Sequence, residues 1–497
     1  MLCFMGRTND KYQYNIDKNN ANVDYLNDSI CLDYGKNIDS PKYLENSIPN
    51  IDKSSTTRLS AALLLSKSQK IFFTFIALVI LVLFIFFDFY NIFMSFFYLV
   101  ILLKFSIVAL QSIRKKIVKN NNFLKTYTIL LPVYREELML DQLIQAIENL
   151  NYPKDLLQVL FLLENDDDKT LQALSIKKIP NYFSVLIVHD EGPKTKARAC
   201  NFGLKYATGE LLVIYDAEDI PEEDQLLEAV KIFNESSDIY LSCLQAKLTF
   251  YNYSTNILSK LCTLEYLMHF NFILPNFSNM KIPIPLGGTS NHFKINALRE
   301  VGGWDQYNVT EDADLTYRLY RKGYKIKMLD SYTYEETVID IKSWVMQRSR
   351  WVKGHIITFL VQTQISFPKL KNSKACNNIF SLYYFMGITF ILSFSQFFFI
   401  IALILSFFCN LSYINLLLSK ICLFLCLYVY IKVPLTVALK EKKLSLLKIC
   451  FIYPFYLMLY TIASTLAVIQ LITNPYKWEK TNHGNNLVND TTNRNDA

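Results

Sequence analysis

The 497-residue chain lacks the cysteine patterns of a zinc-binding or disulfide-rich protein. Its ten cysteines include no C-x-x-C pair and show no regular spacing, and several lie in or beside apolar stretches. They are therefore expected to be free, buried thiols of a reducing compartment. A cleavable leader is not expected either, because no charged N-terminal segment runs directly into an apolar core.

A strongly basic surface is also missing. The net charge is only +7, and no basic patch alternates with aromatic residues. We therefore expect no nucleic-acid partner. The positive charges lie in loops beside apolar segments, as the positive-inside rule predicts for a membrane protein.

Hydrophobic residues are abundant, at 52% of the chain. Residues 71–87 and 92–110 are long enough to form a transmembrane hairpin, within a segment that we place at 66–113. Basic residues flank this hairpin but are absent from its tip, so the chain on either side of it is expected to be cytoplasmic. Further candidate spans, within a segment at 380–473, are residues 383–408, 414–433 and 449–472.

Polar regions lie at both ends of the chain. Residues 1–65 are rich in Asn, Asp, Ser and Lys without periodicity, which predicts disorder, and residues 474–497 form a polar tail. The loop before the last span and the start of the tail are both basic, so the side of the membrane on which the tail lies stays open. We expect a multi-pass protein of the cell (inner) membrane, in contact with membrane lipid.

Residues 120–360 have the pattern of a cytoplasmic α/β domain. Apolar strands alternate with amphipathic helices: strands at 128–134, 157–163 and 185–188 and from 211, with helices at 137–150 and 194–207. This alternation predicts a doubly wound, mainly parallel sheet that binds a nucleotide at the carboxyl ends of its strands. A less regular half follows, from residue 225 to about 354.

The apolar run that begins at Leu211 ends in three acids, Asp216, Glu218 and Asp219. Carboxylates within one turn repel one another unless a cation lies among them. Hard oxygen ligands of this kind suit Mg²⁺ or Mn²⁺ holding a diphosphate. The alternative is a solvated acidic loop after a core strand.

Glu311 and Asp312 open another predicted amphipathic helix. Thr310 and Ala313 do not form a capping box, so the two acids are not required for capping geometry. The alternative is that they only stabilise the helix N-terminus.

Further along, Gln347, Arg350 and Trp351 share one helical face by their i, i+3, i+4 spacing. The alternative for this segment is an interfacial basic helix with a tryptophan anchor.

Together these motifs resemble the processive, membrane-embedded family 2 glycosyltransferases, the group of cellulose, curdlan and hyaluronan synthases. The resemblance covers residues 125–360 and the spans on both sides. It implies a GT-A type nucleotide-sugar-binding domain embedded between transmembrane helices. It also implies a nucleotide-sugar donor, with UDP-glucose as a guess, a glycan or lipid-linked acceptor, and Mg²⁺ or Mn²⁺ as cofactor.

The resemblance implies roles for individual residues. Asp312, with Glu311 beside it, matches the family's catalytic T-E-D motif, in which the Asp is the general base. The D-x-D motif implies metal ligands at Asp216, Glu218 and Asp219. Donor binding is implied for Glu164, Asp166, Arg198, Asp216, Gln347 and Arg350. Acceptor binding is implied for Trp351, Gly288, Thr289 and Ser290.

Some features depart from the family pattern. Arg198 stands where the family often has Lys, and Glu164 replaces the usual Asp; an arginine keeps the charge but changes the geometry toward a phosphate. No cyclic-dinucleotide receptor domain follows the last span, so regulation by that route is not expected.

The function that the resemblance implies is inverting transfer of a sugar to a growing β-glycan at the membrane, with an accessory export subunit as a further partner. Two alternatives stay open. One is a transferase that moves a single sugar to a polyprenyl phosphate. The other is a non-catalytic membrane subunit that keeps the fold.

Overall fold

The computed structural model describes residues 123–189, 192–364, 373–388 and 413–475, with short pieces at 2–5, 22–26, 29–33, 60–62, 64, 69, 390 and 393. The hairpin predicted at 71–110, most of the span at 383–408 and nearly all of the tail at 474–497 lie outside the described residues. So does most of the region 1–65, within which three short strands are described: β1 (Leu2–Met5), β2 (Asn22–Leu26) and β3 (Ser29–Asp33).

The described strands form one sheet in the order β2-β3-β1-β6-β5-β4-β7-β10-β9-β11-β8. Its centre consists of β4 (Tyr127–Val133), β5 (Leu157–Glu164), β6 (Phe183–Val188) and β7 (Leu211–Ile214). These four strands are mutually parallel, in the order β6-β5-β4-β7. The predicted strands are thus confirmed to within about two residues, and with them the α/β class.

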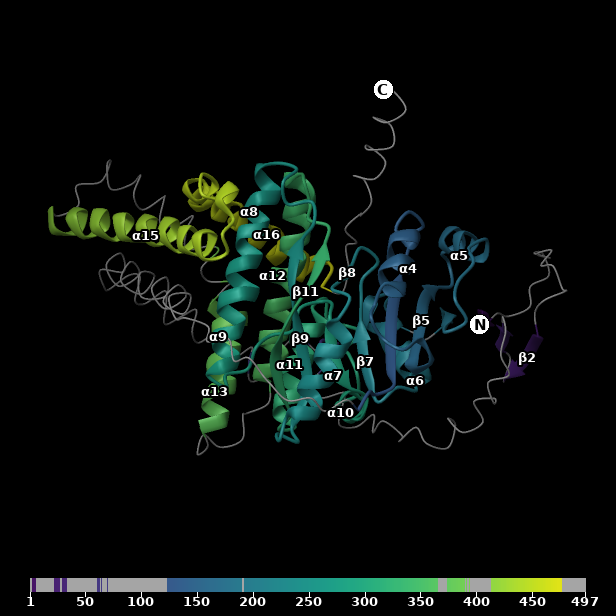
Figure 1. Cartoon of the computed structure of the whole chain (residues 1–497). Helices are drawn as coiled ribbons and strands as arrows, with labels where there is room; N and C mark the ends of the chain where they lie inside the picture. Colours follow the sequence, from purple (N-terminus) through teal and green to yellow (C-terminus); the bar gives the residue numbers. More distant parts are fainter. Residues whose placement is uncertain are drawn as a thin grey trace, which may run out of the picture.

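Helices cover both faces of this centre, as doubly wound connections require (Figure 1). They are α4 (Leu140–Glu148), α5 (Asp168–Ser175), α6 (Lys196–Tyr206) and α7 (Gln225–Glu235). Alternate residues of β4 point to opposite faces: Ile129 packs in the core with α4 and α7, whereas Leu130 packs in the core with α6. Every residue of β7 is buried, which explains why its sequence is uninterruptedly aliphatic.

The second half of the domain extends the same sheet with both antiparallel and parallel strand pairs. It adds β8 (Ile220–Pro221), β9 (Leu241–Phe250), β10 (Asn291–Lys294) and β11 (Lys325–Glu335). β10 is antiparallel to both of its neighbours, β7 and β9, while β11 runs parallel to β9. The sheet is therefore mixed, and the expected parallel arrangement holds for the first half alone. The chain enters β10 through Ser290 at a φ of 56°, a sharp turn after which the strand runs opposite to β7.

Helices of the later chain pack on the second half of this sheet and against one another. They comprise α8 (Ile257–Met268), the π-helical η4 (His269–Ile273), α9 (Leu274–Asn279), α10 (Ile295–Glu300), α11 (Glu311–Arg321), α12 (Ile341–Thr363), α13 (Ser373–Leu382) and the π-helical η5 (Tyr383–Ile388). Glycine at position 354 lets α12 approach α11 closely, because a Cβ there would overlap the side chain of Thr310.

Two long helices end the described chain, α15 (Tyr413–Lys440) and α16 (Tyr453–Thr473). α16 packs along α12, whereas α15 projects from the body of the chain (Figure 1). Within the described part of the chain, α16 is the one helix long and apolar enough to cross a membrane by length and composition. The predicted spans at 414–433 and 449–472 fall on these two helices, and their insertion into a membrane stays a prediction.

Candidate active site

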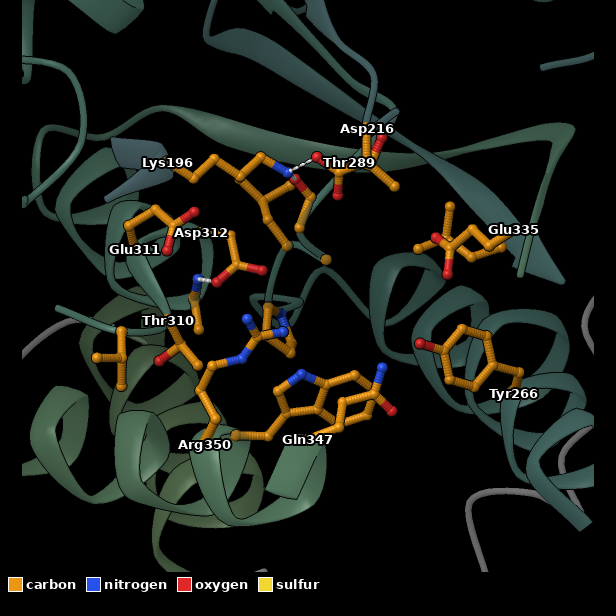
Figure 2. Close-up of a pocket in the computed structure, with 18 of the residues that line it drawn as sticks. Lys196, Asp216, Tyr266, Thr289, Thr310, Glu311, Asp312, Glu335, Gln347 and Arg350 are labelled. Atoms are coloured by element: carbon orange, nitrogen blue, oxygen red, sulfur yellow. Dashed lines mark hydrogen bonds and ion pairs between the residues drawn. The ribbon is translucent and has the colours of Figure 1, made fainter. Parts of the chain in front are cut away.

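A cavity of about 430 Å³ opens where the carboxyl ends of β4, β5 and β7 meet α11 and α12. This is the edge of an α/β sheet at which ligands bind. Figure 2 shows charged side chains on several sides of it: Lys196 and Asp216 on one, Glu311 and Asp312 on a second, Arg350 on a third and Glu335 on a fourth. Acids far apart in sequence, at positions 164, 216 and 312, therefore converge with Arg350 on one cavity, as predicted.

Lys196 is the cation nearest to Asp216. It lies in the first turn of α6, whose N-terminus is capped by the Thr195 side chain. Its ammonium group forms an ion pair with Asp216 and donates a hydrogen bond to the Gly288 carbonyl oxygen (2.7 Å). Burial disfavours the charge of Lys196, but the carboxylates of Asp216 and Glu311 outweigh burial and raise its pKa. The ammonium group therefore stays charged beside the acids.

Asp219 lies beneath this cavity and does not line it. Its side chain is fully buried and accepts hydrogen bonds from the Asp216 backbone N–H (2.7 Å) and from the Thr289 hydroxyl. Burial, and then the charge of Asp216, raises the pKa of Asp219 well above its ordinary value. The structure thus places Asp219 as a brace that fixes the turn carrying Asp216, rather than at the cavity wall with Asp216 and Glu218.

Acidic side chains crowd the side of the cavity formed by Glu218, Glu335 and Glu336. Burial and the neighbouring Asp216 raise the pKa of Glu218 to about 8. Burial, and then the charge of Asp219, raises the pKa of Glu335 well above its ordinary value. The sequence analysis missed Glu335 and Glu336. Two acids directly at the end of a strand were the signal, but the strand itself was not predicted.

Asp312 and Glu311 begin α11, and both line the cavity. Thr310 makes no side-chain capping hydrogen bond, which agrees with the prediction that this is not a capping box. Burial, and then the adjacent charge of Glu311, raises the pKa of Asp312 from 3.8 to about 7. Its carboxylate accepts a hydrogen bond from the Ala313 backbone N–H (2.7 Å). Asp312 is therefore poised to take up a proton near neutral pH.

Gln347, Arg350 and Trp351 all line the cavity, so the single helical face predicted for them is confirmed on α12. The Arg350 side chain points into the cavity toward Asp312 (Figure 2). Burial lowers the pKa of Arg350, and the carboxylates of Glu311 and Asp216 counteract that effect in part.

Glu164 lies on the cavity wall and forms a buried ion pair with Arg198. Arg198 also donates to the Gly192 carbonyl oxygen (3.2 Å) and does not line the cavity. The positively charged residue of α6 that faces the cavity is thus Lys196. The sequence had instead indicated Arg198. Asp166 lies outside the cavity wall as well, in a half-exposed ion pair with Lys194 (2.7 Å).

The loop predicted to bind an acceptor is divided between wall and interior. Gly288 and Thr289 line the cavity, and a Cβ on Gly288 would lie 3.8 Å from both the Asp312 carboxylate and the Lys196 ammonium group. Ser290 is fully buried and shares a hydrogen bond with Thr333 (2.7 Å). Ser290 therefore holds β10 to β11 instead of facing the cavity.

Comparisons with known proteins find glycosyltransferases. The chain is 28% identical over 279 residues to a probable glycosyltransferase, YdaM, of Bacillus subtilis, covering 54% of this chain and 63% of that protein. It is 26% identical over 279 residues to the poly-beta-1,6-N-acetyl-D-glucosamine synthase of Staphylococcus aureus, covering 54% of this chain and 64% of that one. The matched region thus spans less than two thirds of these relatives.

A solved structure has the same fold at low sequence identity. The mannosyltransferase PcManGT of Pyrobaculum calidifontis, in complex with GDP-Man and Mn²⁺, superposes with a TM-score of 0.52 at 15% identity, covering 76% of this chain and 97% of that one. Fold and site together place the chain among the glycosyltransferases. It belongs to the family described as Glycosyl transferase family group 2, which matches residues 211–476, and the Glycosyl transferase family 2 description matches residues 128–291.

The brace beneath the cavity can be tested with Thr289→Val, which removes the hydroxyl that donates to Asp219. We expect a loss of about 1–3 kcal/mol in the free energy of unfolding, because a buried acceptor loses its donor. The hydroxyl favours the charged form of Asp219, so the loss should grow as pH rises and shrink at low pH, where the group is protonated in both states.

The measurement is chemical unfolding of the purified protein at several pH values. Thr255→Val is the matched control, since the exposed Thr255 hydroxyl donates only to the Asn252 carbonyl oxygen. Equal, pH-independent effects of the two substitutions would contradict the bracing role of Thr289.

Proposed function

We propose that the protein is an inverting glycosyltransferase that moves a sugar from a nucleotide-diphosphate sugar to a growing β-glycan at a membrane. The observation that carries the proposal is that Asp216 and Asp312 line one cavity, with Lys196 paired to Asp216 and the Arg350 side chain pointing toward Asp312. One side of this cavity suits a diphosphate, and the other offers a carboxylate with a pKa near neutrality.

The reaction proposed is a single displacement. The acceptor hydroxyl oxygen forms a bond to the anomeric carbon as the bond from that carbon to the diphosphate breaks. The nucleoside diphosphate leaves with the electron pair, and Asp312 takes the hydroxyl proton. The positive charges of Arg350 and Lys196 stabilise the charge that develops on the leaving diphosphate. An α-linked donor would give a β-linked product.

A divalent cation fits the acidic side of the cavity. Burial and mutual repulsion raise the pKa of Glu218 to about 8, and a cation would relieve that repulsion. Among the residues that the structure describes, no three His, Cys, Asp or Glu side chains form a ready metal site. We propose that Asp216 and Glu218 hold Mg²⁺ or Mn²⁺ together with the donor diphosphate, where the ion would neutralise charge on the leaving group. Mn²⁺ accompanies GDP-Man in the structurally similar mannosyltransferase.

The acceptor would lie on the opposite side of the cavity, against Trp351. The wall continues from Trp351 over aromatic residues of α8, η4, η5 and α16, including Tyr266 and Tyr453. Aromatic faces suit sugar rings. Because α16 is apolar enough to cross a membrane, the proposed acceptor path leads from the donor site toward the bilayer. The name of the staphylococcal relative, a synthase of a β-linked polysaccharide, supports the same substrate class.

The test is incubation of the full-length protein in membranes with a panel of radiolabelled nucleotide sugars, with and without Mg²⁺ or Mn²⁺. The proposal expects metal-dependent incorporation into a polymer. A lipid-extractable product with one sugar would instead identify a polyprenyl-phosphate transferase. Absence of both transfer and donor hydrolysis would identify a non-catalytic subunit.

The role of Asp312 predicts that Asp312→Asn lowers kcat by about 10²–10⁴-fold, the usual contribution of a positioned base. Binding of the nucleoside diphosphate should survive, because Asp216 and Arg350 are untouched. Isothermal titration and product counting measure the two quantities. Asp330→Asn, on an exposed carboxylate paired with Lys247, is the control. Normal turnover of Asp312→Asn would end the assignment.

The raised pKa of Asp312 predicts the pH profile. A base must be deprotonated, so kcat/KM should rise with pH through a midpoint near pH 7 and level off at higher pH. The charge of Glu311 contributes to this raised pKa, so Glu311→Gln should move the midpoint to lower pH. A flat profile across this range in the unmodified protein would contradict the prediction.

A further inference from the structure

We propose that the Arg348–Glu265 ion pair is a positioning device that fixes Gln347 and Trp351 in place relative to the apolar helix α16. The inference rests on the proposed function, since it concerns how the acceptor side of that cavity is held. Arg348 lies on α12 between the cavity-lining residues, but it does not line the cavity itself, and it is only 1% exposed.

One guanidinium group contacts both of its neighbours in the motif. It donates from Nη1 to the Gln347 side-chain oxygen (2.9 Å), and its Cζ lies 3.8 Å from the centre of the Trp351 ring. Arginine suits this task because its planar group can stack on an aromatic ring and donate hydrogen bonds from its edge at the same time. The indole of Trp351 is thus fixed on the side turned away from the cavity.

The remaining face of Arg348 is bound by Glu265 of α8. Nη2 donates to the Glu265 carboxylate (2.9 Å), which also accepts hydrogen bonds from the hydroxyls of Tyr456 (2.5 Å) and Tyr460 on α16. The Tyr456 hydroxyl in turn accepts a hydrogen bond from the Trp344 indole N–H (3.0 Å). A single carboxylate therefore joins α8, α12 and α16.

Electrostatics keep this pair ionised. Burial disfavours both charges, but Arg348 and the two tyrosine hydroxyls outweigh burial and lower the pKa of Glu265, while Glu265 raises the pKa of Arg348. Removing either partner would leave a buried charge without compensation, so separating the pair has a high free-energy cost. A shift of α16 would move Glu265 through its two tyrosine hydrogen bonds. Glu265 would then move Arg348, and Arg348 would move the indole ring on which it stacks.

The experiment compares Arg348→Lys and Glu265→Gln with the unmodified full-length protein. Lysine keeps the charge but cannot stack and donate as guanidinium does, and glutamine removes the charge that holds Arg348. We expect each variant to lower kcat about 100-fold, the effect of a reacting group displaced by roughly 1 Å. Affinity for the nucleoside diphosphate should fall far less than kcat, because Asp216 and Arg350 are intact and Gln347 is the one implied donor-binding residue that the substitutions displace.

A second readout does not depend on transfer. Trp351 is one of four tryptophans, and its fluorescence is obtained by subtracting the spectrum of the matching Trp351→Phe form. Acrylamide quenching of this signal should increase in both variants, because the indole loses its covering guanidinium. Arg299→Lys is the control, since Arg299 binds only the Leu204 and Ala207 carbonyl oxygens.

Unchanged Trp351 quenching in the two variants would overturn the proposal. A loss of nucleotide affinity as large as the loss of kcat would also overturn it, since that result indicates that the donor side of the cavity is disturbed as much as the acceptor side. If the unmodified protein transfers no sugar, the proposed function fails, and the quenching comparison still decides whether Arg348 positions Trp351.

Discussion

The crowding of like charges in one poorly hydrated cavity is the constraint on which the rest of this site depends. Asp216, Glu218, Glu311 and Asp312 face the same space, and Lys196 and Arg350 are among the cations that line it. Such a cluster survives only because buried hydrogen bonds and a rigid sheet hold it, at a cost in folding stability. The same crowding raises carboxylate pKa values toward neutrality and leaves a place for a cationic or proton-donating ligand.

Much of this arrangement could be predicted because it follows from local patterns. The aliphatic runs at β4, β5 and β7 and the acids behind them place charges at the carboxyl edge of a parallel sheet. The i, i+3, i+4 spacing likewise puts Gln347, Arg350 and Trp351 on one helical face whatever the helix packs against. These inferences need only the periods of strands and helices.

The structure departs from the expected placements where tertiary packing decides which way a side chain points. Lys196 and Arg198 are two residues apart on α6, so they point in nearly opposite directions, and only the rotation of α6 against the sheet decides which one faces the cavity. β11 carries a register shift between Met328 and Tyr332, which obscured its strand pattern and hid Glu335 at its end. Asp219 was grouped with Asp216 by proximity in sequence, but the turn directs its side chain into the interior.

The glycine at position 354 affects how α11 and α12 can move relative to each other. At Gly354, α12 touches Thr310, the residue directly before α11, with no room for even a methyl group. The helix that carries Arg350 and the helix that begins with Glu311 and Asp312 are therefore closely packed at this point. A hinge motion between these two helices would have to open this contact. We therefore expect ligands to enter and leave by displacement of the surrounding loops, while the backbones that carry Arg350 and Asp312 keep their spacing.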